Sequence, residues 1–226
     1  MEKGFVYIRD IEPSIIENIR YYTLDNFVGE RIDGYLKPVA IATRECALAL
    51  QKVQREVRAD NWNLVIYDAY RPKKAVAHFI RWGESDDIRQ KAQYYPNLNK
   101  SQVFNGYLAR VSGHSRGSTV DLSLLRVGQE LQWPVRESTR AMADGTRAPF
   151  RDDGTMDCGT SWDLLDPLSN HDNPLINATD TRWTDRRNYL RSVMVRNGFR
   201  PLPKEWWHYT LIDEPFDNTY FDFDVK

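Results

Sequence analysis

The spacing of apolar residues predicts three amphipathic helices. Over residues 38–60, 71–83 and 184–197, apolar side chains recur every three or four positions with charged side chains between them. This period places the apolar residues along one face of a helix. Gly83 closes the second stretch and Gly198 follows the third, where glycine commonly ends a helix. We therefore expect three helices that each bury one face.

Strands are predicted between and after these helices. The segments 62–67 and 206–212 are rich in aromatic and β-branched residues, and in 120–124 apolar residues alternate with Asp121 and Ser123. The elements alternate without the regular rhythm of a parallel βαβ fold, and no glycine-rich phosphate loop follows a strand. The pattern predicts an α+β fold over residues 1–226, a single domain with a mainly antiparallel central sheet flanked by helices.

Two further stretches have a distinct character. Residues 126–158 are polar, contain glycine and arginine, and show little periodicity, so we expect a surface excursion rather than a second domain. Four aromatic residues should pin the C-terminal tail to the body of the protein: Phe216, Tyr220, Phe221 and Phe223.

Composition narrows the possible functions. The 226 residues include 31 Lys or Arg and 32 Asp or Glu, so the net charge is −1 and the basic excess of a nucleic-acid-binding protein is missing. Two cysteines, Cys46 and Cys158, cannot form a disulfide framework or a four-thiolate metal site. The chain has four histidines, so the candidates for metal or acid–base chemistry are few.

The sequence favours a soluble protein without a membrane partner. No window approaches the roughly 20 apolar residues that span a bilayer, and the first ten residues lack the core of a signal peptide. We therefore expect a cytoplasmic protein, or a periplasmic one if a signal peptide was removed. The sequence does not indicate an oligomeric state.

One candidate site lies in the segment from Ser112 to Asp121. His114 stands in a loop rich in glycine and serine, and Asp121 follows seven residues later on the polar face of an otherwise apolar strand. Both side chains could enter one pocket. The alternative is a hydrogen-bonded pair with a structural role.

A second candidate site is the segment Glu205-Trp206-Trp207-His208-Tyr209. Here a carboxylate and an imidazole lie three residues apart among bulky aromatic side chains, which suggests a polar site in an apolar wall. The alternative is a surface acid–base pair beside aromatic residues of the core.

Together the two segments predict a catalytic zinc site in a cleft on the sheet. His114, Asp121 and His208 would provide three ligands, and catalytic zinc keeps its fourth position open for water. Glu205 could then accept the proton of that water and return it to a leaving amine. The predicted chemistry is hydrolysis of an amide bond with one Zn²⁺ per chain; Co²⁺ or Mn²⁺ could occupy the same ligands.

Three sequence motifs together resemble those of a known family. The pattern Ser-x-His-x-x-Gly-x-Ala-x-Asp, with Glu-Trp-Trp-His downstream and Tyr-Asp-Ala-Tyr-Arg-Pro upstream, is similar to the D-alanyl-D-alanine dipeptidases of the vancomycin-resistance VanX type, in the zinc D,D-peptidase family M15. The resemblance covers nearly the whole chain. It implies a hydrolase that cleaves the D-alanyl-D-alanine dipeptide, in peptidoglycan precursor metabolism or in glycopeptide resistance.

The resemblance implies a role for each matching residue. His114, Asp121 and His208 match the zinc ligands, Glu205 matches the general base, and Arg71 matches the arginine that stabilises the oxyanion. A fixed guanidinium beside the metal would provide charge where charge develops.

The substrate-binding residues follow from the same resemblance. Asp163 matches the acidic residue that receives the free ammonium of the dipeptide, and Ser112 and Tyr21 line the same end of the site. The chain departs from the family at Thr119, where alanine is usual, at Trp162, where phenylalanine is usual, and in the longer stretch 126–158. These differences bear on specificity more than on metal chemistry.

Two other functions remain open from the sequence. A D,D- or L,D-carboxypeptidase acting on longer peptidoglycan peptides would need an open cleft in place of the Asp163 site. A non-catalytic zinc-binding module would need neither Glu205 nor Arg71. The remaining histidines, His78 and His171, and both cysteines are expected to be structural.

Overall fold

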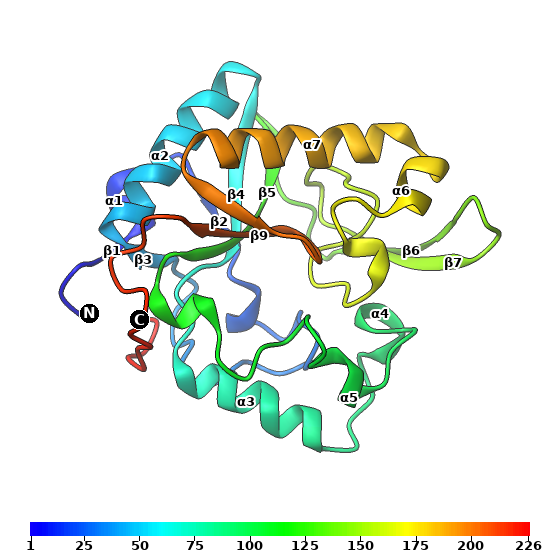
Figure 1. Ribbon diagram of the computed structural model, residues 1–226, viewed down its shortest axis with the longest axis horizontal. Helices are drawn as coiled ribbons and strands as arrows, with labels where there is room; N and C mark the ends of the chain where they lie inside the picture. The colour runs from blue at the N-terminus through cyan, green and yellow to red at the C-terminus, as the bar shows by residue number, and fades with distance from the viewer.

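The computed structural model describes residues 1–226 and has a five-stranded sheet at its centre (Figure 1). The strands lie in the order β2 (Ile16–Glu17), β4 (Trp62–Asp68), β5 (Thr119–Arg126), β9 (Glu205–Leu211) and β8 (Phe199–Leu202). β2 pairs with β4 in parallel, and all other neighbours are antiparallel. The prediction of an α+β fold with a mainly antiparallel sheet is confirmed.

Two long helices cover one face of this sheet (Figure 1). α2 (Arg44–Ala59) packs on β4, α7 (Thr181–Arg196) packs on β8 and β9, and the two helices contact each other. Because side chains alternate along a strand, the apolar residues of β5 face the helices while Asp121 and Ser123 face the other way. α3 (Lys73–Glu84) lies on that other side of the molecule (Figure 1).

The remaining elements are short. The other helices and strands are α1 (Ile8–Ile11), α4 (Lys91–Tyr94), α5 (Lys100–Val103), α6 (Pro174–Thr179), β1 (Phe5–Tyr7), β3 (Ile41–Thr43), β6 (Arg136–Ala141) and β7 (Arg147–Asp152). Three 3-10 helices complete the fold: η1 (Arg20–Tyr22), η2 (Gly113–Arg116) and η3 (Pro167–Ser169). None of the helices has the length and apolar character needed to cross a membrane.

The helix predicted over 38–60 begins later than expected. Residues 41–43 instead form β3, which pairs with β1, and the helix starts only at Arg44. The Oγ1 atom of Thr43 accepts a hydrogen bond from the backbone N–H of Cys46 at 3.3 Å and so caps the helix. Tertiary pairing with a strand from the N-terminus therefore overrides the local helical pattern, and the prediction was wrong over its first six positions.

The third helix and the stretch 126–158 also differ in detail from the prediction. α7 starts at Thr181, three residues before the expected position, because Asp180 caps it through the N–H of Arg182. The stretch 126–158 contains the hairpin β6–β7, which projects from one end of the molecule (Figure 1). β6 is largely exposed, whereas Met156 and Cys158 beyond the hairpin are buried in the main core.

The C-terminal tail is fixed by aromatic packing on the first strand. The ring of Phe5 lies 4.9 Å from that of Phe221, 5.0 Å from that of Phe223 and 5.8 Å from that of Phe216. The predicted role of these tail residues agrees with the structure. The tail also contacts the candidate site, because the backbone N–H of Phe221 donates to the carbonyl of Ser115.

Candidate active site

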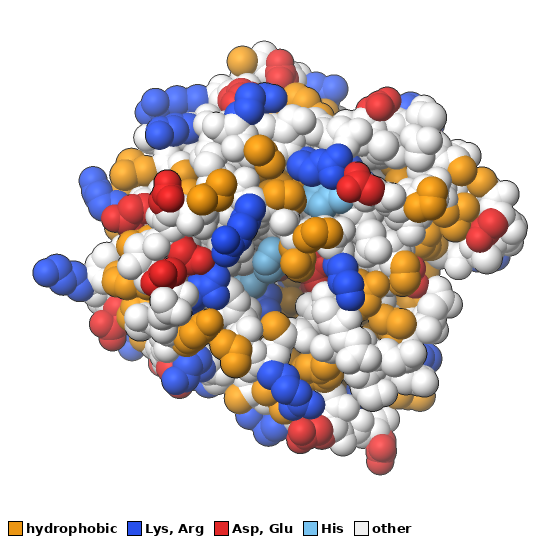
Figure 2. Space-filling model, viewed as in Figure 1, with side chains coloured by type: hydrophobic (Ala, Val, Ile, Leu, Met, Phe, Trp, Pro, Cys, Tyr) orange, Lys and Arg blue, Asp and Glu red, His pale blue; other side chains and the backbone are white.

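A cavity of about 370 Å³ opens on the face of the sheet that α2 and α7 leave uncovered. Figure 2 shows a hollow in the middle of one face of the molecule, with histidine side chains nearby. All eight residues predicted for the site line this cavity: Tyr21, Arg71, Ser112, His114, Asp121, Asp163, Glu205 and His208. Residues from Tyr21 near the start of the chain to His208 near its end thus meet at one place.

His114 is held by the short helix η2. Ser112 caps this helix, since its Oγ accepts from the N–H of His114 at 3.3 Å, and Gly117 ends it with a φ of 86°. The Nδ1 atom of His114 lies 2.8 Å from the carbonyl oxygen of Ala69. A carbonyl can only accept, so Nδ1 carries a proton and Nε2 faces the cavity.

Asp121 and His208 are neighbours across the β5–β9 pair. Their Cα atoms are partners in the antiparallel register, so both side chains emerge on the same face of the sheet. His208 Nδ1 lies 3.0 Å from Asp121 Oδ1 and 3.3 Å from His114 Nε2, and His114 Nε2 lies 3.4 Å from Asp121 Oδ1. The strand register therefore brings three potential ligand atoms to one point.

This cluster has the chemistry of a metal site. The three ligand atoms lie within 4.8 Å of one another, and Asp121 Oδ1 is buried without a hydrogen-bond partner. Burial lowers the pKa of His208, which favours the neutral imidazole that a metal requires. Although burial opposes it, the two histidines hold the pKa of Asp121 below its usual range, so the carboxylate is ionised. Two imidazoles and one carboxylate form a set that suits zinc.

Glu205 enters the cavity from the start of β9. Residues three apart on a regular strand face opposite sides, but a register shift between Pro201 and Leu202 interrupts the pairing where Leu202 meets Glu205. The Oε2 atom of Glu205 consequently lies 3.4 Å from His208 Nδ1. Burial and the charges of Asp121 and Asp163 raise the pKa of Glu205 well above its ordinary value, which suits a group that takes up a proton.

Arg71 is held in place by Asp68, a residue without a predicted role. Asp68 lies at the end of β4, fully buried, and its Oδ2 accepts from Arg71 Nε at 2.9 Å. The guanidinium also lies 3.7 Å from Asp121 Oδ2, and it sits 5.1 Å from the ring centres of Tyr21 and Phe79. A carboxylate three residues before Arg71, at the end of a buried strand, was the available signal in the sequence.

Asp163 also lines the cavity and lies in the loop between β7 and η3. Its backbone has a φ of 59°, a left-handed conformation that is uncommon outside glycine, asparagine and aspartate. Its Oδ2 accepts a hydrogen bond from the hydroxyl of Tyr21 at 2.7 Å. Burial, and then the charge of Asp121, raise the pKa of Asp163 to about 8. A cationic ligand would relieve this accumulation of negative charge.

One wall of the cavity was not predicted. The segment from Phe104 to Ala109 after α5 closes the pocket, and Tyr107 and Leu108 line it. Lys204, next to Glu205, donates from Nζ to the carbonyl of Asn105 at 2.8 Å and ties this segment to the β8–β9 turn. The segment lacks a periodic pattern and a recognisable motif, so its place at the site could not be predicted from the sequence.

The residues expected to be structural lie outside the cavity. His78 Nδ1 accepts from the backbone N–H of Asp33 at 3.2 Å, and His171 is buried with its ring 6.0 Å from that of Tyr209. Cys46 and Cys158 are both buried and free. Trp162, beside Asp163, packs on the rings of Tyr21 and Tyr67 at 5.4 and 5.1 Å.

Comparison with known proteins identifies the family. The family model Peptidase M15, described as D-ala-D-ala dipeptidase, matches residues 1–133 and 134–226. Three relatives named D-alanyl-D-alanine dipeptidase match over 100% of both chains: one from Streptomyces coelicolor at 36% identity, one from Enterococcus faecalis at 35% and one from Enterococcus faecium at 34%. The resemblance found in the sequence motifs is confirmed, and the chain belongs to the M15 peptidase family of D-alanyl-D-alanine dipeptidases.

Proposed function

We propose that this enzyme hydrolyses the D-alanyl-D-alanine dipeptide to two molecules of D-alanine with one zinc ion per chain. The observation that carries the proposal is the convergence of His114 Nε2, His208 Nδ1 and Asp121 Oδ1 in a cavity that also holds Glu205 and Asp163. The names of the full-length relatives support the substrate.

The charge of the cavity fits these ligands. With all carboxylates ionised, Asp68, Asp121, Asp163 and Glu205 face only Arg71, which leaves a formal charge of 1 − 4 = −3. Two positive charges from a metal would offset most of this charge, and the ammonium of the substrate would pair with Asp163 although the substrate carboxylate brings one negative charge of its own. His114, Asp121 and His208 would hold the zinc, whose Lewis acidity activates water and polarises the scissile carbonyl.

Glu205 performs the proton transfers in this proposal. Its carboxylate accepts a proton from the attacking water and then donates it to the nitrogen of the leaving D-alanine. The raised pKa of Glu205 favours the protonated form after the first transfer. The position of its carboxylate beside His208 keeps it close to the reacting water.

Arg71 stabilises the negative charge that develops on the carbonyl oxygen. Asp68 accepts a hydrogen bond from Nε of Arg71 and pairs with its Nη2, so the guanidinium is already in position before the reaction begins. A preoriented donor costs no reorganisation in the transition state, and this is the advantage of the buried Asp68–Arg71 pair.

Asp163 binds the free ammonium group of the dipeptide, and Tyr21 orients its carboxylate. Ser112, which lines the same cavity, would contact the substrate through its hydroxyl. A buried carboxylate selects strongly for a charged amine, because a blocked amine leaves that carboxylate without a partner. This selection favours a dipeptidase over a carboxypeptidase that acts on longer, N-blocked peptides.

Purified protein loaded with zinc tests the proposal. It should release D-alanine from D-alanyl-D-alanine, lose this activity with a chelator, and act far more slowly on L-alanyl-L-alanine and on the N-acetylated dipeptide. Hydrolysis of an N-acetylated or pentapeptide substrate at an equal rate would favour the carboxypeptidase alternative. Bound zinc without hydrolysis of any D,D-peptide would favour the non-catalytic alternative.

A further inference from the structure

Arg187 is a buried cation on α7 whose partners are not carboxylates. Its side chain is fully buried, and burial lowers its pKa to about 10, so it remains charged at neutral pH. Its four hydrogen bonds go to three backbone carbonyls and one hydroxyl. A buried charge without an anionic partner is costly, and its hydrogen bonds must compensate.

All four acceptors lie in the loop 158–170, which carries Asp163. Arg187 Nε donates to the carbonyl of Cys158 at 2.7 Å, and Nη1 donates to that of Asn170 at 2.6 Å. Nη2 donates to the carbonyl of Leu168 at 2.9 Å and to Thr160 Oγ1 at 3.3 Å. One guanidinium thus joins the two ends of the loop, and Asp163 lies between them.

The same contacts connect the loop to the catalytic side of the cavity. Thr160 Oγ1 also accepts from Trp206 Nε1 at 2.8 Å, and Trp206 is the residue after Glu205. Within the loop, Ser169 Oγ donates to the carbonyl of Leu164 at 2.6 Å, next to Asp163. The left-handed Asp163 therefore belongs to a loop without strand pairing, held by these side-chain hydrogen bonds and by one backbone bond from the N–H of Leu165 to the carbonyl of Tyr94 at 2.7 Å.

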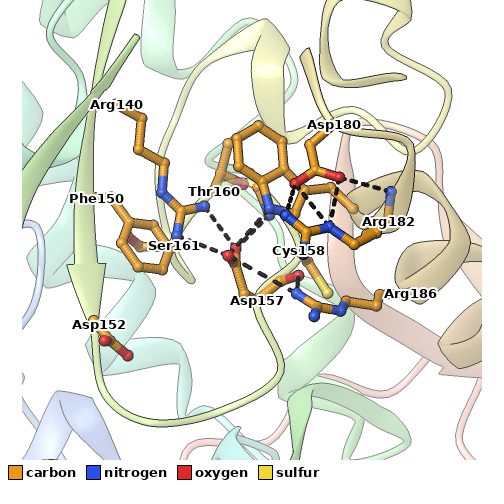
Figure 3. A network of polar contacts seen from close by, with 12 residues as sticks. Arg140, Phe150, Asp152, Asp157, Cys158, Thr160, Ser161, Asp180, Arg182 and Arg186 are labelled. Carbon is orange, nitrogen blue, oxygen red and sulfur yellow. Dashed lines mark hydrogen bonds and ion pairs between the residues drawn. The ribbon is translucent and has the colours of Figure 1, made fainter. Parts of the chain in front are cut away.

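A second network holds the start of the loop (Figure 3). The carboxylate of Asp157 accepts from both terminal nitrogens of Arg140 on β6, at 2.6 and 2.8 Å, and from Trp183 Nε1 on α7 at 3.1 Å. The carbonyl of Asp157 accepts from Arg186 at 2.8 Å. This network links the hairpin to α7, but its contacts from α7 stop at Asp157. Arg187 is the residue of α7 that bonds to both ends of the loop, at Cys158 and at Asn170.

We propose that Arg187 is a positioning residue that determines selectivity for a free amino terminus by holding the loop 158–170 and, through it, Asp163. The inference rests on the proposed function, because it assigns to Asp163 the ammonium of the substrate. Arg187 itself contacts neither substrate nor metal. Its removal should weaken binding of the ammonium and leave the zinc ligands, which β5, β9 and η2 position, in place.

The test uses Arg187→Met, Arg187→Lys and Thr160→Val in the full-length zinc enzyme. We expect KM for D-alanyl-D-alanine to rise about 10- to 100-fold in Arg187→Met with a smaller change in kcat, because a displacement of about 1 Å can cost 100-fold. Arg187→Lys keeps the charge but cannot bridge four acceptors, so it should rescue only part of the loss. The ratio of kcat/KM for the free dipeptide to that for the N-acetylated dipeptide should fall most in Arg187→Met and less in Arg187→Lys.

Arg191→Met is the matched control. Arg191 lies one turn further along α7 and pairs with the exposed Asp172 at 2.9 Å, so its removal should change neither KM nor selectivity. Zinc content should stay at that of the wild type in every variant. If Arg187→Met does not fold, Arg187→Lys and Thr160→Val decide the outcome through the same KM and selectivity measurements.

Three results would overturn the inference: unchanged KM and selectivity in folded variants, loss of zinc together with activity, or an equal effect of Arg191→Met. A wild-type enzyme that leaves the free dipeptide intact would instead contradict the proposed function. The two failures are therefore distinguishable.

Discussion

The two sides of the cavity are built by different means. On the metal side, Asp121 and His208 are register partners on adjacent strands, and backbone hydrogen bonds fix their spacing. On the side proposed to bind the substrate ammonium, here called the ammonium side, Asp163 lies in a loop without strand pairing, where Arg187 bonds to both ends of the loop and to Thr160. One side depends on the backbone ladder, and the other depends on particular side chains.

Under the proposed function, this difference separates the residues of the reaction from those that determine selectivity. A slip of one residue would move the buried faces of β5 and β9 out of the core, so their register is strongly specified, and the metal side should tolerate substitutions that keep the apolar alternation. The loop 158–170 depends on a small number of buried polar contacts, and a single substitution there can displace Asp163. We therefore expect variants to fall into two classes, those that lose the metal or the reaction and those that lose only the preference for a free amine.

The largest effect is expected for His114→Ala. Removal of one of three ligands should abolish stable zinc binding and reduce hydrolysis to background, because the remaining carboxylate and imidazole cannot hold the ion alone. Metal analysis after dialysis, together with release of D-alanine, measures both losses. His78→Ala on α3 is the control and should retain zinc and activity. Retained zinc in His114→Ala would contradict the assigned ligand set.

Glu205→Gln should separate the reaction from the metal. The amide cannot accept a proton, so kcat should fall about 100- to 10,000-fold while the zinc content and the fold remain. Circular dichroism, metal analysis and kcat measure the three properties. If Glu205→Gln keeps its activity, another group performs the proton transfers, and Glu205 has no part in the reaction.

The grouping of His114, Asp121 and His208 could be predicted largely from the sequence. Alternation in 120–124 placed Asp121 on the polar face, and the motif resemblance paired it with His114 and His208. These residues follow from local periodicity and short motifs, which a sequence displays directly. The register that joins Asp121 to His208 is a long-range property, yet two correctly placed strands leave few alternatives for it.

The supports of the ammonium side could not be predicted in this way. Arg187 lies on the buried face of α7, four positions after Trp183 and three before Leu190, so the helical period could have placed it toward the core. The sequence does not show that its hydrogen-bond acceptors lie in the loop 158–170, because those contacts are long-range. Asp68 was overlooked although its position three residues before Arg71 was a signal, because its role becomes plain only where Arg71 and Tyr35 both donate to its carboxylate. The hairpin was missed although Asp144-Gly145 is a turn signal, since its flanking residues are mostly polar.

Asp163→Asn should affect selectivity more than chemistry. The amide keeps the shape and the hydrogen bond with Tyr21 but loses the charge, so kcat/KM for the free dipeptide should fall about 10- to 100-fold, in line with a charged hydrogen bond of about 1.5–3 kcal/mol. Activity on the N-acetylated dipeptide should change little. An equal loss on both substrates would place Asp163 in the reaction rather than in ammonium recognition.

The smallest effect concerns acid stability on the loop side. His171 follows the loop directly, neither ring nitrogen has a hydrogen-bond partner, and burial, with the charges of Arg191 and Arg187, lowers its pKa to about 4. The unfolded chain takes up this proton near the ordinary histidine pKa of about 6.5, so stability is present above that value and is lost as the pH falls toward 4.

His171→Phe removes this titration and keeps a ring against Tyr209. In zinc-free protein, the free energy of unfolding measured with urea should fall between about pH 7 and pH 5 by about 2 kcal/mol more in the wild type than in the variant. An equal fall in both proteins would show that His171 is not the group responsible. A smaller fall in the variant would locate the acid-sensitive part of the fold beside the loop that Arg187 holds, rather than in the sheet that carries the metal ligands.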